Sequence, residues 1–448
     1  MPVQTTLKAV GVAQVIVTLK SVPPGNGAAL AAAGTDVNRL ARHFRRSENS
    51  RPGAVAMAAG VRQPPSPYKV YANLGVILGT VDEKGYQGLK KEPSVKAVTE
   101  APQMSLIRPV AATVAAAVKG PTWGIKRLGV DKLWAKGFIG TGVLVGHLDT
   151  GVDGKHAAFK GGAIAKFAEF DDLGEIVPGA KAHDSDEHGT HTAGTIAGRP
   201  VKGSQFGVAP GARLASAMVI EGGNVIARIL AGMDWIVGEG ARILSMSLGL
   251  RGVHNDFVPL MQALRNRGIL PVIAVGNEGP GTSRAPGNYD IVLSVGASNE
   301  NDEVADFSSS QRFVRPGDPL VPDVVAPGVD TLSALPGGKF GEFSGSSMAT
   351  PHIAGLAALL WQAKPGASVK EIETAIQRSC RRPASMPEAR ANRGVPDAVK
   401  ALSILQGAGA KTGTAKGRTG GPRKAVRVTA GGTPRKLTKA SKVVRKVK

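Results

Sequence analysis

Short apolar runs alternate with segments of helical periodicity through the middle of this 448-residue chain. The apolar runs, which predict buried strands, cover residues 143–148, 213–219, 243–247, 270–275 and 291–295. The segments with helical spacing of apolar residues cover 188–197, 224–238, 256–267, 348–362 and 368–380. Strands and helices in alternation form a mostly parallel sheet with helices on both faces. We therefore predict an α/β fold of the doubly wound type.

The first 120 residues follow a different pattern. Strands are expected at Ala13–Leu19, at 69–74 and at 95–98, with a helix at 81–90 and a long loop at 47–67. This mixture predicts a small α+β domain over residues 1–120, ahead of the α/β domain over residues 121–405.

The end of the chain, residues 406–448, is a low-complexity tail. Residues 411–448 hold 13 Lys and Arg and no acidic residue, a large part of the net charge of +22. Such a composition predicts disorder, and it permits non-specific contact with polyanions through counterion release. The tail has no aromatic residue to stack on bases, so it does not favour sequence-specific recognition. A solvated tail, or one trimmed on maturation, is an equally good interpretation.

Composition and the start of the chain narrow the class of protein. With 42% hydrophobic residues the chain can bury a sizeable core, and a single cysteine excludes an internal disulfide framework. No apolar run reaches the roughly 18 residues that a membrane span needs, so no membrane partner is expected. The start, Met1 to Gln4, lacks the basic and apolar regions of a secretory signal, which leaves the compartment open.

Four polar residues lie at places where sites assemble in such folds. Asp149 and Asn277 each follow a predicted strand, His188 opens a helix, and Ser347 lies at the mouth of another helix. The carboxyl ends of parallel strands meet at one edge of a sheet. A serine needs an adjacent base to act as a nucleophile, and a histidine held by a carboxylate supplies one.

Each of these residues also has a simpler interpretation. Ser347 could cap a helix, and Asn277 could be a turn residue in a left-handed conformation. Asp149-Thr150-Gly151 is also the aspartic-protease motif, although no second copy occurs in the chain. His188, His191 and the nearby His183, Asp184 and Asp186 could form a metal cluster, but their spacing is not that of His-Glu-x-x-His.

Together the four segments resemble those of the subtilisin-like serine proteases, in that family's order of Asp, His and Ser. Ser245-Met246-Ser247-Leu248-Gly249 adds to the match, which runs from about Trp123 to about Leu402. The resemblance implies a catalytic triad of Asp149, His188 and Ser347. It also implies an oxyanion hole made by the Asn277 amide and the Ser347 backbone N–H. The implied function is a serine endopeptidase that forms an acyl-enzyme intermediate.

The resemblance also indicates where a protein or peptide substrate lies. The segments Ser247-Leu248-Gly249 and Ala274-Val275-Gly276 match those that bind the substrate as an added strand and wall its main pocket. Their apolar character predicts broad specificity with an apolar bias. The pocket floor, residues 284–287, begins with Arg284, which leaves room for an acidic contribution.

Further expectations concern cofactors. Calcium is common in the family, but Ala158 replaces an expected carboxylate and the loop 199–205 lacks the usual asparagine. We therefore predict neither a cofactor nor that calcium site, with Asp171, Asp172 and Glu175 as a weaker alternative.

The N-terminal segment resembles the propeptide of a zymogen, which acts as intramolecular inhibitor and chaperone. Its cleavage is expected between Ile107 and Trp123. The alternative is an accessory domain that stays attached. Relatives of this kind are often secreted. There are two alternative functions. The chain could be an inactive binding protein on the protease fold, or its main role could be polyanion binding through the tail.

Overall fold

The computed structural model describes residues 3–20, 37–45, 66–220 and 223–410. The basic segment 411–448 lies outside these residues, so its predicted disorder and polyanion contact stay predictions. Most of the predicted loop at 47–67 lies outside them as well. Within the described part of the chain, no helix is both long and apolar enough to cross a bilayer.

A seven-stranded sheet forms the centre of the larger domain, in the order β19-β16-β14-β12-β8-β11-β9. Every neighbouring pair in it is parallel. The strands are β8 (Leu144–Asp149), β9 (Ile164–Glu169), β11 (Arg213–Met218), β12 (Ile243–Met246), β14 (Leu270–Ala274), β16 (Leu293–Ser298) and β19 (Val324–Pro327). The five predicted strands are confirmed with small shifts at their ends, whereas β9 and β19 were not predicted.

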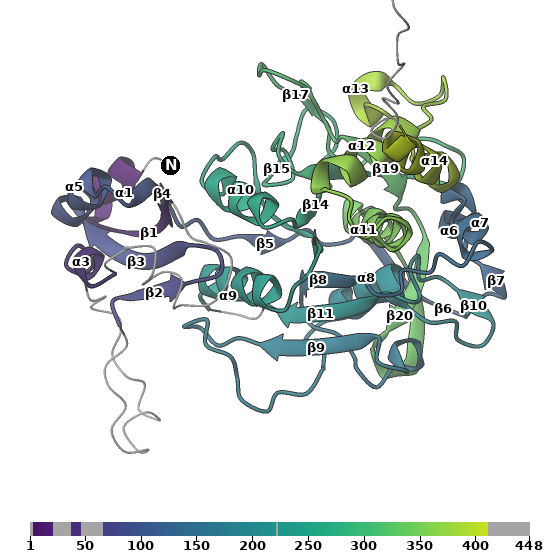
Figure 1. Ribbon diagram of the computed structural model, residues 1–448, viewed down its shortest axis with the longest axis horizontal. Helices are drawn as coiled ribbons and strands as arrows, with labels where there is room; N and C mark the ends of the chain where they lie inside the picture. Colours follow the sequence, from purple (N-terminus) through teal and green to yellow (C-terminus); the bar gives the residue numbers. More distant parts are fainter. Residues whose placement is uncertain (1–2, 21–36, 46–65, 221–222, 411–448) are drawn as a thin grey trace, which may run out of the picture.

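Helices cover both faces of this sheet, as the alternating pattern predicted (Figure 1). On one face α8 (His188–Ala197) and α11 (Ser346–Ala363) share a core with Val145 and Val272. On the other face α9 (Val225–Gly238) and α10 (Val258–Asn266) share a core with Leu148 and Ile273. Apart from the edge strand β9, these strands are buried on both faces, which explains why their sequences are predominantly apolar.

Two of the C-terminal helices, α12 (Val369–Ser379) and α14 (Ala398–Ala410), pack against α11. The short helix α13 (Glu388–Ala391) lies between them in the chain. α12 begins with a capping box in which Ser368 and Glu371 bond each other's backbone N–H. α14 runs through the boundary predicted between residues 405 and 406, because the helix continues into a stretch rich in Gly and Ala that has little apolar periodicity. The division of the chain into domains stays a prediction.

The N-terminal domain is a four-stranded antiparallel sheet in the order β2-β3-β1-β4, with helices on one face. Its elements are α1 (Val3–Val10), β1 (Val12–Leu19), α3 (Val37–Ala41), β2 (Tyr68–Tyr71), β3 (Val76–Asp82), α5 (Glu83–Lys91) and β4 (Val95–Glu100). β3 was not predicted, and the expected helix at 81–90 begins only after Asp82, whose side chain caps it by accepting from the N–H of Gly85 (2.7 Å).

The open face of this N-terminal sheet packs on α9 and α10 (Figure 1). Ile16 and Leu78 share one apolar core with those helices. At its edge the hydroxyl of Tyr71 donates to the carbonyl of Ala227 (3.0 Å), and Asp234 accepts from the N–H of Leu74 (2.8 Å). The two domains therefore meet along both apolar and polar contacts.

Three short strands carry the chain from one domain to the other. β5 (Ser105–Leu106) pairs with β13 (Leu248–Arg251), β6 (Ala111–Ala115) with β21 (Lys339–Ser344), and β7 (Gly120–Pro121) with β10 (Ser204–Gln205). The linking segment thus joins strands of the α/β domain well before the boundary predicted at residue 120. The remaining elements are α6 (Trp123–Leu128), α7 (Val130–Trp134), η1 (Ala157–Phe159), β15 (Arg284–Ala285), β17 (Gln311–Arg312), β18 (Leu320–Val321), β20 (Thr331–Leu335) and η2 (Pro336–Gly338).

Candidate active site

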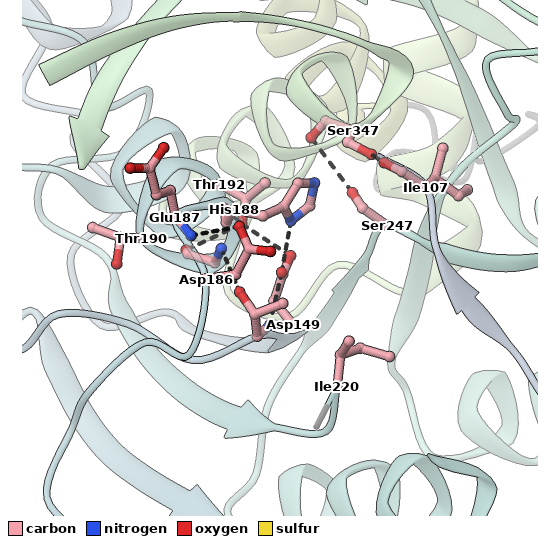
Figure 2. A network of polar contacts seen from close by, with 12 residues as sticks. Ile107, Asp149, Asp186, Glu187, His188, Thr190, Thr192, Ile220, Ser247 and Ser347 are labelled. Carbon is pink, nitrogen blue, oxygen red and sulfur yellow. Dashed lines mark hydrogen bonds and ion pairs between the residues drawn. The ribbon is translucent and has the colours of Figure 1, made fainter. Parts of the chain in front are cut away.

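The end of β8 and the start of α8 bring Asp149 and His188 into direct contact. The Nδ1 atom of His188 lies 2.6 Å from Oδ1 of Asp149, and both residues are about 99% buried, at 1% exposure each. Two glycines permit this approach: a Cβ on Gly189 would lie 2.1 Å from the carbonyl oxygen of Gly151, which itself has a positive φ of 120°. In Figure 2 the imidazole lies with Nδ1 facing Asp149 and Nε2 on the side of Ser347.

The pKa values of the pair diverge because each stabilises the charged form of the other. Burial alone lowers the pKa of His188, but the charge of Asp149 and the hydrogen bond to it outweigh burial and hold that pKa above its usual value. Asp184 and Asp186 add to this effect. Burial raises the pKa of Asp149, yet His188 and the N–H of Thr150 outweigh it and keep that pKa below its usual range. Asp149 is therefore ionised at neutral pH.

Ser347 lies in the first turn of α11, which begins at Ser346 and not near Met348 as predicted. Pro351 lies inside this helix and not in its first turn. A proline there cannot bond the carbonyl four residues earlier, which is that of Ser347. The hydroxyl of Ser247 lies 3.4 Å from this carbonyl instead. Ser247 therefore takes the place of the missing helical N–H at the Ser347 carbonyl.

The hydroxyl of Ser347 does not cap the helix, so the simpler interpretation of this serine is wrong. It donates to the carbonyl oxygen of Ile107 at 2.6 Å, as Figure 2 shows. Meanwhile Nε2 of His188 is buried and has no hydrogen-bond partner among the described residues. The imidazole of His188 and the hydroxyl of Ser347 therefore belong to one site, and the hydroxyl is hydrogen-bonded to the linking segment.

Asn277 faces the same point from the end of β14. Its Nδ2 donates to the carbonyl of Arg108 at 2.9 Å, and its Oδ1 accepts from the N–H and the hydroxyl of Ser346, both at 2.8 Å. Gly345 leaves room for this amide, since a Cβ there would lie 3.1 Å from Nδ2. Asn277 is not among the described residues with a positive φ, so its interpretation as a left-handed turn residue is wrong.

The predicted substrate segment Ser247-Leu248-Gly249 does bind an extended peptide, which is the chain's own residues 105–107. Leu248 pairs with Leu106, Gly249 pairs with Ser105, and the N–H of Ile107 donates to the carbonyl of Ser247 (3.0 Å). The side chain of Ile107 is fully buried, whereas Arg108 is exposed and pairs with Asp186 (3.1 Å). A cavity of about 450 Å³ lies beside this peptide.

The second predicted segment, Ala274-Val275-Gly276, is bonded into the domain. The carbonyl of Val275 accepts from the N–H of Arg284 (2.9 Å), and that of Gly276 accepts from Ser309 (3.0 Å). No hydrogen bond between these three residues and the described linking segment is recorded, so their role in substrate binding stays a prediction.

Arg284, placed by the sequence at the pocket floor, has a partner for its charge. Its guanidinium forms an ion pair with Glu278, with Nε 2.9 Å from Oε1, and Nη1 donates to the hydroxyl of Ser105 (3.2 Å). The acidic contribution that we left open for a substrate side chain is therefore supplied by Glu278.

The alternative of a metal cluster around the histidines has no support among the described residues. In the described part of the chain, no group of three or more His, Cys, Asp or Glu side chains is arranged so that it could hold a metal ion. His191 bonds the carbonyl of Thr331 (2.8 Å) and stacks on Phe343, and Asp184 accepts from the hydroxyls of Thr150 (2.7 Å) and Thr190 (2.6 Å).

The acids offered as a weak calcium site also have protein partners. Asp172 pairs with Arg228 (2.8 Å) and Glu175 with Lys69 (2.7 Å). Asp171 accepts from the N–H groups of Leu173 and Glu175. Calcium dependence itself stays a prediction.

Comparison with known proteins agrees with this geometry. The sequence profile of the subtilase family matches residues 140–409, which is more than half of the chain. The chain belongs to the subtilase family. Subtilisin E of Bacillus subtilis (strain 168) is 33% identical over 305 residues, which cover 66% of this chain and 73% of that protein. Subtilisin Savinase of Lederbergia lenta is 34% identical over 261 residues, which cover 57% of this chain and 90% of that protein.

The expected resemblance is therefore confirmed, and with it the α/β fold. This subtilase is a serine-type endopeptidase, a hydrolase of peptide bonds in proteins or peptides. The resemblance predicted that the end of the N-terminal segment lies in the site, with cleavage between Ile107 and Trp123, but the sequence did not select the bond. The structure places the carbonyl of Ile107 at the Ser347 hydroxyl.

Proposed function

We propose that this subtilase cleaves peptide bonds with Ser347 as nucleophile, His188 as general base and Asp149 as the group that orients and stabilises the imidazole. The 2.6 Å contact between His188 and Asp149, buried and opposite Ser347, carries this proposal. Nδ1 of His188 carries the proton and donates a hydrogen bond to Asp149, so Nε2 is free to act as a base.

The reaction then proceeds in two halves. The Ser347 oxygen attacks the substrate carbonyl carbon while its proton passes to Nε2 of His188. The imidazolium returns this proton to the leaving amine as the carbon–nitrogen bond breaks, which leaves an acyl-enzyme. Water then repeats these steps and releases the acid. Nδ2 of Asn277 and the N–H of Ser347 stabilise the oxyanion.

We also propose that the N-terminal segment acts as an intramolecular inhibitor. In support, Ser347 contacts the carbonyl of Ile107 while Asn277 contacts the next carbonyl, that of Arg108. In this contact the Ser347 hydroxyl, which is the nucleophile, donates to the carbonyl oxygen of Ile107 and not to His188, while the Asn277 amide, an oxyanion donor, bonds the carbonyl of Arg108. Neither group is placed to start attack at the carbonyl of Ile107, so this contact is an inhibited one. Cleavage at Ile107–Arg108 requires the Asn277 amide to shift to the carbonyl of Ile107.

The specificity that the site supports is broad, with an apolar residue before the scissile bond. Ile107, whose carbonyl meets Ser347, is fully buried, and the charge of Arg284 is paired. Main-chain pairing with Ser247 to Gly249 tolerates many sequences. We expect a library of peptides to show cleavage after several apolar residues. A strict requirement for Asp, Glu, Lys or Arg at that position would contradict the proposal.

The activity is expected to fall on the acidic side of neutrality. The base must be neutral, and the pKa of His188 is raised above its usual value near 6.5, chiefly by Asp149 against burial. As the pH falls through this raised pKa, His188 gains a proton and kcat/KM drops tenfold for each pH unit. A plot of log kcat/KM against pH should therefore bend above about pH 6.5. A bend well below that value would contradict the assigned base.

A further inference from the structure

A buried chain of polar side chains lies behind the carboxylate of Asp149. His147 precedes Asp149 by two residues in β8, so both project from the same face of the sheet. Ser216 is the register partner of His147 on β11, and Thr192 follows His188 by one turn of α8. Ser216, His147, Thr192 and Asp149 are all at most 1% exposed.

These side chains are connected end to end. Nδ1 of His147 lies 3.0 Å from the hydroxyl of Ser216, and Nε2 lies 2.8 Å from the hydroxyl of Thr192. That threonine hydroxyl lies 3.1 Å from Oδ2 of Asp149. The other carboxylate oxygen, Oδ1, already accepts from Nδ1 of His188 (2.6 Å) and the N–H of Thr150 (2.8 Å). Figure 2 shows Thr192 next to the Asp149–His188 pair.

The direction of each hydrogen bond follows from the charge of Asp149. The Thr192 hydroxyl has one proton and three nearby acceptors: Oδ2 of Asp149 at 3.1 Å and the carbonyls of His188 and Gly189, both at 3.2 Å. The ionised carboxylate is the strongest of the three acceptors. The Thr192 hydroxyl must then accept a hydrogen bond from Nε2–H of His147. Nδ1 of His147 in turn accepts a hydrogen bond from the hydroxyl of Ser216. This arrangement needs a neutral His147, and burial lowers the pKa of that imidazole to about 4.

We propose that Ser216, His147 and Thr192 form a positioning network that aims a row of hydrogen-bond donors at Oδ2 of Asp149. The network sets how strongly this carboxylate holds the His188 imidazolium. The inference rests on the proposed roles of Asp149 and His188. A carboxylate that accepts an additional hydrogen bond is a weaker base, and its orientation is more tightly fixed. All three residues are buried, at most 1% exposed, so they act through Asp149.

Replacing Thr192 with valine tests the network, since valine keeps the shape of threonine and lacks the hydroxyl. We expect kcat to fall about tenfold with KM nearly unchanged, the size of effect typical for one hydrogen bond to a charged group. The acidic limb of the pH profile should move upward by several tenths of a pH unit, because Asp149 becomes more basic. The other acids that face His188, Asp184 and Asp186, keep their contacts in this variant.

Two control variants separate this role from packing. Thr192→Ser restores the hydroxyl and should recover most of kcat and the original pH profile. Thr195→Val makes the same change one turn further along α8, where the hydroxyl donates to the carbonyl of His191 (3.0 Å), and should leave the pH profile unchanged. A Thr192→Val enzyme with the original pH profile would overturn the proposal. So would a Thr192→Ser enzyme that behaves like Thr192→Val.

The tautomer of His147 can be measured without relying on activity. We expect NMR of the full chain, with ¹⁵N-labelled histidine and the Ser347→Ala change, to show a neutral His147 protonated at Nε2 from pH 7 down to about pH 5. A proton at Nδ1, or an imidazolium in this range, would overturn the network. Because this readout does not depend on catalysis, it distinguishes failure of the network from failure of the proposed function.

Discussion

Replacing Ser347 with alanine is expected to lower kcat by about a million-fold, the effect known for loss of the nucleophile in subtilisin, a member of the same family. No other described side chain has its hydroxyl on the carbonyl of Ile107. The variant should not react with a fluorophosphonate probe that labels the wild type. It should also remain one uncut chain, because the bond after Ile107 meets no nucleophile. Peptide assays, probe labelling and intact mass measure these results.

The matched control is the neighbouring hydroxyl. Ser346→Ala removes a contact with Oδ1 of Asn277 but keeps the backbone N–H that bonds the same atom at 2.8 Å. This variant should still be labelled by the probe, with a smaller loss of kcat. Labelling that persists in Ser347→Ala, or that disappears in Ser346→Ala alone, would show that the nucleophile is not Ser347. Cleavage after Ile107 in purified Ser347→Ala would show that a second protease performs the maturation.

The second large effect is expected from Asp149→Asn, which should lower kcat by about 10⁴-fold. The asparagine amide can occupy the same space, but an NH₂ group facing Nδ1 favours the tautomer with the proton on Nε2. The base would then point away from Ser347. The raised pKa of His188 also depends chiefly on Asp149 among its charged neighbours. The acidic limb of the remaining activity should therefore move to lower pH.

Asp153→Asn is a suitable control for this prediction. Asp153 lies four residues further along the chain and accepts from the N–H groups of Lys155 and Gly337, both at 2.9 Å. Its neutralisation should leave kcat and the pH profile close to those of the wild type. Equal losses in the two variants would indicate a general effect of charge on folding. An Asp149→Asn enzyme within tenfold of the wild type would exclude the assigned role.

Much of the fold was predictable because the strands of the central sheet are buried on both faces. β8, β11, β12, β14 and β16 are predominantly apolar for that reason. The strand β9 was missed because it lies at the edge of the sheet, where Lys166 and Glu169 interrupt the apolar pattern. β19 was missed because it has only four residues and ends in Pro327. Periodicity has little to detect in such short or exposed strands.

The sequence by itself determined the residue types of the site and their order. Asp149, His188, Asn277 and Ser347 each stand at a strand or helix end, and such ends carry local signals of turns and glycines. The tertiary structure alone decided what meets these residues. That Ile107 reaches Ser347 depends on a pairing between β5 and β13 across more than a hundred residues.

The contact of His147 with Thr192 likewise joins a strand to a helix. Sequence patterns report local periodicity, whereas such contacts depend on how distant elements pack.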